Sequence, residues 1–285
     1  MNNTVVFIII FLISQNTMAQ TGSRLIGSAA VTQIEGSSGS GLLPWATISG
    51  YADAAQSDFT LSYSSLDTKD YRFSMKSLSW GWNNRLELSV AKQQLDLQTL
   101  GPAIGMPDAQ LKQTVIGAKL RLFGHLIYSK YPQVSLGLQY KTNNEFLVPS
   151  LVGAAKKQGV DVYLSATKLF LSKPFGFNGF ATFNLRATKA NEIGLLGFGG
   201  DINNDYRILV ENSFGVFVKK NVALGFDFRQ KKSNLGFAKE SHWRDVFVSW
   251  LPNKHLSLTL AYVDLGGVAT LKNQQGLYFS ISGVF

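Results

Sequence analysis

The chain has 285 residues, a formal net charge of +9 and no cysteine, so disulfides and thiolate metal sites are excluded. Charged residues make up 16% and aromatic residues 12%, a balance that suits a protein with one face toward lipid. Its Lys and Arg residues are scattered singly between apolar residues, a pattern that does not predict nucleic-acid binding and fits lipopolysaccharide or small anionic solutes better.

The N-terminal residues have the features of a secretory signal. Val5 to Ile13 form an uncharged apolar run, and small residues at Thr17 and Ala19 predict cleavage after Ala19. The run is too short for a membrane-spanning helix, which needs about 20 apolar residues. We therefore expect a signal peptide at 1–19 and a mature chain of 20–285, with an uncleaved helical anchor as the alternative.

Period-2 alternation dominates the mature chain, as in Leu86, Leu88 and Val90 against polar or small neighbours, and this period is typical of strands. The alternating segments are longer than the average soluble strand of about 5–6 residues. They match the length of about 9–11 residues that a tilted membrane strand needs. Strands are predicted at 44–53, 57–66, 70–80, 84–95, 111–123, 131–143, 159–171, 175–187, 205–218, 220–231, 242–251, 254–265 and 275–285.

These segments predict an all-β fold, a single antiparallel up-and-down transmembrane barrel. Bacterial single-chain barrels have an even number of strands, so Arg24 to Glu35 is expected to supply a fourteenth strand. The alternative is twelve strands, with residues 20–53 forming an N-terminal plug or lid. The region 20–43 is thus either a first strand or part of a plug. A phase slip near Ser77 indicates a bulge.

Short and long connections alternate along the chain. Short turns are predicted at 82–84, 172–174, 219–221 and 252–254, and long loops near 96–110, 143–159, 188–205 and 232–241. Barrels of this class have short periplasmic turns and long extracellular loops. Phe285 is therefore expected at the periplasmic end.

The polar side of each strand is expected to face the lumen, with basic residues modestly in excess. This predicts a passive, porin-like channel for small polar or anionic solutes; the alternative is a non-conducting structural or surface-binding barrel braced by ion pairs. The candidate lumen and selectivity residues are Arg72, Arg85, Glu87, Lys119, Arg121, Lys141, Arg186, Arg207, Glu211, Asp227 and Arg229, with Lys76, Asp161, Asn184, Arg244 and Asp245 beside them.

One long loop contains a glycine-rich run. Gly194, Leu195, Leu196, Gly197, Phe198, Gly199 and Gly200 lack the Lys-Ser/Thr ending of a phosphate-binding loop and lie between strands. We interpret this run as a flexible outer loop or, more sharply, as a constriction loop folded into the lumen, since long loops often carry function.

The sequence predicts no enzyme and no cofactor or metal. A lipid-modifying activity would centre on His242, with Ser241, Glu240 and Asp245 nearby. A Ser–His–acid site needs its three groups to converge, and neighbours on one strand point to opposite faces.

The C-terminus ends in alternation, with Leu277, Phe279, Ile281 and the terminal Phe285 on one face. This ending resembles the closing strand of an outer-membrane barrel and its signal to the barrel-assembly machinery. It predicts location in the outer membrane of a Gram-negative bacterium, with the bilayer and lipopolysaccharide as partners.

Several stretches resemble a proteobacterial family that is catalogued only as a domain of unknown function. They are GLLPWA at 41–46, DVYLSATKLF at 161–170, RATKAN at 186–191 with LLGFGG at 195–200, and PNKHLSL at 252–258 with AYVDLG at 261–266. The resemblance covers nearly the whole mature chain. It implies an outer-membrane β-barrel and brings no established activity or site residues.

Overall fold

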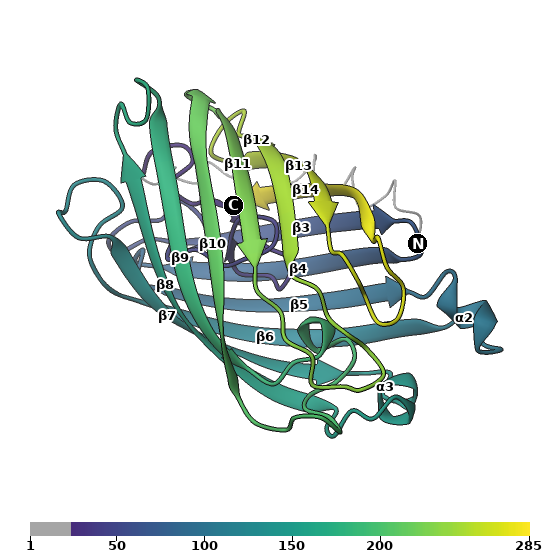
Figure 1. Cartoon of the computed structure of the whole chain (residues 1–285). Helices are drawn as coiled ribbons and strands as arrows, with labels where there is room; N and C mark the ends of the chain where they lie inside the picture. Colours follow the sequence, from purple (N-terminus) through teal and green to yellow (C-terminus); the bar gives the residue numbers. More distant parts are fainter. Residues whose placement is uncertain (1–23) are drawn as a thin grey trace.

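The computed structural model describes residues 24–285, so the expected signal peptide lies outside the described residues. Twelve antiparallel strands close into a barrel, in which the last strand pairs with the first (Figure 1). The wall strands are β3 Ser57–Thr68, β4 Arg72–Trp82, β5 Leu86–Asp96, β6 Gln110–Phe123, β7 Gln133–Asn143, β8 Gln158–Phe170, β9 Asn178–Thr188, β10 Arg207–Lys219, β11 Val222–Arg229, β12 Trp243–Trp250, β13 Leu256–Asp264 and β14 Gln275–Val284.

The predicted barrel is confirmed, with twelve strands and not fourteen. All twelve predicted strands from residue 57 onward have a counterpart in the wall. The predicted strands at 24–35 and 44–53 are wrong: the region holds only a two-residue pair, β1 Val31–Thr32 with β2 Ser38–Gly39. This segment is rich in Gly and Ser, and it has no continuous apolar face that could contact lipid. It therefore does not form a wall strand.

The connections mostly alternate in length as expected. The exceptions are the three-residue connection 69–71 between β3 and β4, among the long loops, and the nine-residue connection 124–132 between β6 and β7, among the short turns. Short turns follow β4, β8, β10 and β12 at one end, which also holds the C-terminus. The longer loops lie at the other end and carry α2 Leu100–Ala103, α3 Leu147–Leu151 and the 3-10 turn η1 Glu192–Gly194 (Figure 1). The end with the long loops is called the outer end below.

Each wall strand has an apolar side that faces outward. Ile116, Leu138, Phe183 and Leu260 are each between 46% and 54% exposed, whereas the alternate positions of the same strands are buried. A surface of this kind suits lipid, and a closed barrel leaves no unpaired edge in hydrocarbon. No helix in the described part of the chain is long and apolar enough to cross a membrane.

The orientation of β4 differs from the prediction. Phe73 and Met75 are buried, while Arg72 and Lys76 face outward, and the Arg72 guanidinium pairs with Asp67 at 2.5 Å. These residues lie near the outer end, where a strand leaves the hydrocarbon and polar side chains can face water. No bulge occurs near Ser77; the described wall shifts register at 217–219 and 121–123.

Residues 24–56 are called the plug segment below. From 27 to 52 this segment lies inside the barrel, whereas Leu25, Ile26, Ala54 and Ala55 near its ends are exposed (Figure 1). Leu42, Leu43, Ala46 and Ile48 are no more than 1% exposed. At the tip of the β1–β2 hairpin, Gly36 has a φ of +91°, and a Cβ there would lie 2.8 Å from Ala91 Cβ of β5. Only glycine allows both this backbone conformation and so close an approach to the wall.

Candidate functional site

Wall side chains hydrogen-bond the backbone of the plug segment. Gln133 Nε2 and Ser135 Oγ both donate to Ala46 O at 2.6 Å, and Asn184 Nδ2 donates to Pro44 O at 2.6 Å. Because the plug segment has almost no ladder of its own, its buried backbone groups need such partners. Polar wall residues therefore serve as the docking surface for the plug segment.

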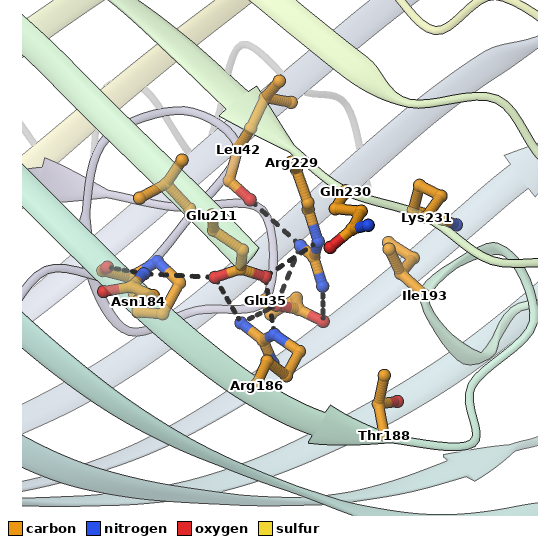
Figure 2. A network of polar contacts seen from close by, with 12 residues as sticks. Glu35, Leu42, Asn184, Arg186, Thr188, Ile193, Glu211, Arg229, Gln230 and Lys231 are labelled. Carbon is orange, nitrogen blue, oxygen red and sulfur yellow. Dashed lines mark hydrogen bonds and ion pairs between the residues drawn. The ribbon is translucent and has the colours of Figure 1, made fainter. Parts of the chain in front are cut away.

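A buried carboxylate anchors the hairpin tip. Glu35, whose side chain is 0% exposed, contacts Lys141 Nζ of β7. It also contacts Arg186 Nη2 of β9 at 3.3 Å and Arg229 Nη1 of β11 at 3.1 Å (Figure 2). One acidic side chain of the plug segment thus faces three cations from three separate strands. The arrangement ties the plug segment to one side of the wall.

Two wall carboxylates complete this cluster. Asp161 lies 2.7 Å from Lys141 Nζ. Glu211 lies 2.6 Å from Arg186 Nε and 3.2 Å from Arg229 Nε (Figure 2). Three cations and three anions therefore balance, as burial of charge requires. Without Glu35, the wall part of the cluster would carry one uncompensated positive charge.

A second ion pair holds the other side of the plug segment. Lys119 Nζ lies 3.2 Å from Glu87 and donates to the carbonyls of Ser38 and Thr47. The Glu87 carboxylate accepts hydrogen bonds from the backbone N–H groups of Ser38 and Ser49. Both members of this pair contact the plug segment directly.

Two acidic residues lie side by side on the inner wall. Asp227 of β11 and Asp245 of β12 are directly opposite in the ladder and are 0% and 2% exposed. Asp227 accepts the Leu42 N–H at 3.2 Å, while both Asp245 oxygens are buried without a hydrogen-bond partner. Like charges in this position repel.

Replacing Asp245 with Asn is expected to stabilise the barrel by about 1 kcal/mol, because it removes a buried carboxyl group that has no hydrogen-bond partner and lies opposite Asp227. Urea titration in lipid vesicles measures the change. Asp67→Asn, which removes an exposed partner of Arg72, is the control and should change stability little. An Asp245→Asn variant no more stable than wild type would contradict the repulsion.

The predicted lumen residues fall into two groups. Those buried on the inner wall are Glu87, Lys119, Lys141, Arg186, Glu211, Asp227 and Arg229. Arg121 and Arg207 are half-buried, Arg85 is exposed in the turn before β5, and Arg72 is on the outer face. Their role in selectivity stays a prediction.

The expected basic excess is not found among the buried wall charges of the described chain. The basic ones are Lys119, Lys141, Arg186 and Arg229, and the acidic ones are Glu87, Asp161, Glu211, Asp227 and Asp245. Arg72, Lys76 and Arg244 were predicted to face inward but face outward. Their absence from the interior accounts for much of the missing basic excess.

The run Gly194 to Gly200 folds into the outer end of the lumen. Ile193, Leu195, Leu196 and Phe198 are between 2% and 4% exposed. The Ile193 carbonyl accepts hydrogen bonds from Lys141 and Gln113, although Ile193 has a φ of 61°. A β-branched residue in this region is strained, so these contacts must hold the loop in place.

Above the plug segment, three charged residues from two loops meet. Lys231 Nζ lies 3.1 Å from Glu192 and also contacts Glu240, and the Glu192 N–H donates to Glu240 at 3.2 Å. Burial raises the pKa of Glu240 to about 7, with Lys231 opposing and Glu192 adding to the shift. Burial lowers the pKa of Lys231, but Glu192 and Glu240 outweigh it and raise the pKa overall.

Contact between these two loops is expected to weaken as the pH rises. Glu240 binds a proton more tightly in the closed loops, with a pKa of about 7, than at its ordinary value of 4.5. As the pH rises from about 4.5 to about 7, the equilibrium constant for contact between the two loops therefore falls, by up to about tenfold per pH unit. Hydrogen exchange at the Glu192 amide, corrected for its intrinsic rate, measures this. Glu240→Gln should remove the pH dependence, and an unchanged profile in that variant would contradict the assignment.

The residues around His242 do not converge. His242 Nδ1 accepts the Lys231 N–H at 3.1 Å, while Asp245 is buried on the inner wall. Within the described residues, no group of three or more His, Asp or Glu side chains is placed to hold a metal ion.

The sequence analysis did not single out Glu35, Glu192, Lys231 or Glu240 as site residues. The sequence does contain an indication that Glu35 is special, because Arg24 and Glu35 are the only charged residues between positions 24 and 52. Both are buried and bonded, since Arg24 donates to the carbonyls of Ile48 and Gly50. An isolated charge in a Gly- and Ser-rich segment therefore marked an anchor.

A closed antiparallel barrel with an apolar outer surface and a polar interior defines a β-barrel membrane protein of the outer-membrane type. The chain belongs to the DUF3034 family, described as proteins of unknown function, which matches residues 28–282. A comparison with curated proteins finds no match.

Solved barrel structures are similar in fold. The KdgM porin has a TM-score of 0.51 at 9% identity, with 79% of this chain and 99% of the porin covered. The COG4313 outer membrane channel from Pseudomonas putida F1 has a TM-score of 0.49 at 11% identity, covering 82% and 97%. Omp33 of Acinetobacter baumannii has 0.48 at 10% identity, covering 80% and 98%. The likeness to KdgM shows a shared barrel fold.

Proposed function

We propose that the protein is a gated channel of the Gram-negative outer membrane for small polar or anionic solutes, closed from within by its plug segment. The observation that carries the proposal is the Glu35 contact with Lys141, Arg186 and Arg229. When Glu35 leaves, the three cations of the wall are balanced by only two carboxylates, Asp161 and Glu211, and the cluster carries one excess positive charge. A solute carboxylate or phosphate would replace the charge that Glu35 supplies.

The strand number supports this proposal. Eight-stranded barrels are filled by their side chains, whereas 16–18 strands leave an aqueous channel. Twelve strands lie between these limits, and here the space is taken by a segment held through hydrogen bonds and ion pairs. Such contacts can be exchanged for water or solute, and we therefore expect that the plug segment leaves without unfolding the wall, although its apolar residues must also separate from the wall.

A non-conducting barrel is the second candidate. The plug segment and the loop around Ile193 share one apolar core with the wall, which includes Ile34, Leu42 and Leu195. A core of this kind favours a permanently filled lumen, with the outer loops left to contact lipopolysaccharide or a partner.

Planar-bilayer recordings separate the two candidates. A variant lacking residues 24–52 is expected to carry a steady, anion-preferring current, while wild type shows rare openings or none. A variant lacking residues 194–200 tests whether that loop narrows the path. Absence of current in both deletion variants, with normal barrel assembly, would favour the non-conducting barrel.

Assembly is proposed to depend on the terminal aromatic residue. Phe285 exchanges backbone hydrogen bonds with Phe59 of β3 and so closes the barrel seam. We propose that the assembly machinery recognises this end of β14. No catalytic role is proposed.

A further inference from the structure

A cavity of about 180 Å³ lies at the outer end, among the loops that follow β5, β7, β9, β11 and β13. Its lining is apolar except for Tyr71 and Glu192. We propose that this cavity binds a small apolar molecule, or an apolar group of a solute, about the size of a single six-membered ring. The proposal goes beyond conduction, since binding here does not require an open lumen.

The two polar residues of the lining are already satisfied by the protein. Tyr71 Oη donates to the Val268 carbonyl at 3.2 Å. The Glu192 carboxylate accepts the Ala269 N–H at 3.2 Å and contacts Lys231 Nζ at 3.1 Å. A water molecule needs about two to four polar partners to occupy a cavity. Because these groups are engaged, the cavity favours an apolar occupant over water.

The volume sets the size of the ligand. An engineered cavity of about 150 Å³, lined by Leu, Ile and Phe, stays dry and binds benzene or xenon. At about 180 Å³, this cavity has room for one ring with a small substituent. A polar molecule of that size would lose its hydration without gaining hydrogen bonds.

The entrance is apolar as well. Ile104 and Met106, which follow α2, are 47% and 38% exposed, and Leu147 and Leu151 of α3 are 62% and 75% exposed. Three of these residues, Ile104, Met106 and Leu151, also line the cavity. Exposed apolar side chains gathered on loops at the water-facing end mark a contact surface for apolar molecules.

The cavity leads toward the plug segment. A second apolar cavity of about 40 Å³ shares Tyr71, Leu95, Glu192 and Val268 with the first and is bounded by Ile34 and Leu42 of the plug segment. Ile34 precedes Glu35 in the chain. A molecule bound at the mouth therefore lies on an apolar path to the residues that hold the plug segment in place.

Two probes test the site in the full mature chain. Crystals under xenon pressure are expected to show density between Leu97, Leu111 and Val152. Fluorobenzene binding to protein in lipid nanodiscs, followed by 19F NMR with empty nanodiscs as the blank, is expected to saturate. Val152→Phe should fill the cavity and weaken binding at least tenfold. Val162→Phe, the same change on the lipid-facing side of β8, should leave binding unchanged.

Leu97→Phe provides a second cavity-filling variant, and heat-dependent migration on gels confirms that each variant folds. Xenon that avoids the cavity, or equal fluorobenzene binding in Val152→Phe and Val162→Phe, would overturn the proposal. So would a lipid or detergent tail that cannot be displaced by fluorobenzene. None of these readouts depends on current through the barrel, so a failure here is distinct from a failure of the channel proposal.

Discussion

Replacing Glu35 with alanine is expected to release the plug segment from the lumen. Lys141, Arg186 and Arg229 would keep only the carboxylates of Asp161 and Glu211 as partners. Removing one member of a buried ion cluster costs about 3–5 kcal/mol, because a charge is left uncompensated away from water. A cost of that size increases the population of the released state by about a hundredfold or more.

The absence of cysteine from the chain makes this release simple to measure. Ser40→Cys places a single thiol in the plug segment, at a position 1% exposed. A water-soluble maleimide should label it slowly in the otherwise unchanged chain and about a hundredfold faster when Glu35→Ala is added.

Glu145→Ala is the matched control for the loss of a carboxylate. Glu145 lies 3.8 Å from Lys112 and its side chain is 53% exposed, so its loss should leave labelling unchanged. Equal labelling rates with and without Glu35→Ala would show that the buried cluster does not hold the plug segment.

The wall could be predicted because lipid imposes a simple rule on sequence. A strand between lipid and a polar interior must alternate, so Leu136 and Leu138 face outward while Ser135 and Gln139 face inward. Turn residues such as Asn83 and Asn84, both with positive φ, mark the short ends. The rule fails at Arg72, which begins β4 at the outer end and faces outward, because polar side chains can face outward where a strand leaves the hydrocarbon.

The plug segment could not be predicted from that rule. Residues 44–53 alternate weakly, but both sides of this stretch are buried inside the barrel. The expectation of a fourteenth strand came from parity, and a plug satisfies parity equally well. The partners of Glu35 depend on which parts of the wall the hairpin tip reaches, and that is set by the closed barrel as a whole.

The charged site was predicted only in part, because its contacts join residues that are far apart along the chain. Lys141, Arg186 and Arg229 were recognised as lumen residues from their strands, but their common partner lies more than 100 residues away from each of them along the chain. The cluster of Glu192, Lys231 and Glu240 forms between two loops, and loop sequences carry no periodic signal that would bring them together.

Replacing Gly137 with alanine is expected to destabilise the barrel by about 3 kcal/mol, at the upper end of ordinary overpacking costs. Gly137 of β7 is directly opposite Tyr163 of β8, and an added Cβ would lie 2.0 Å from Tyr163 Cζ. The ring cannot move aside easily, because it is 1% exposed and the Arg186 guanidinium lies 5.0 Å from its centre. The substitution should therefore disturb the Glu35 cluster through Arg186.

Gly117→Ala on β6 is the matched control for this change. A Cβ at Gly117 would meet Ser89 Oγ at 2.4 Å, a hydroxyl that can rotate away, so urea titration in vesicles should show a small effect. Adding Tyr163→Leu to Gly137→Ala should recover part of the lost stability, since the shorter side chain leaves room for the new methyl group. If the two alanine variants unfold at the same urea concentration, the ring does not pack against the glycine, and Arg186 is positioned by its carboxylate partners alone.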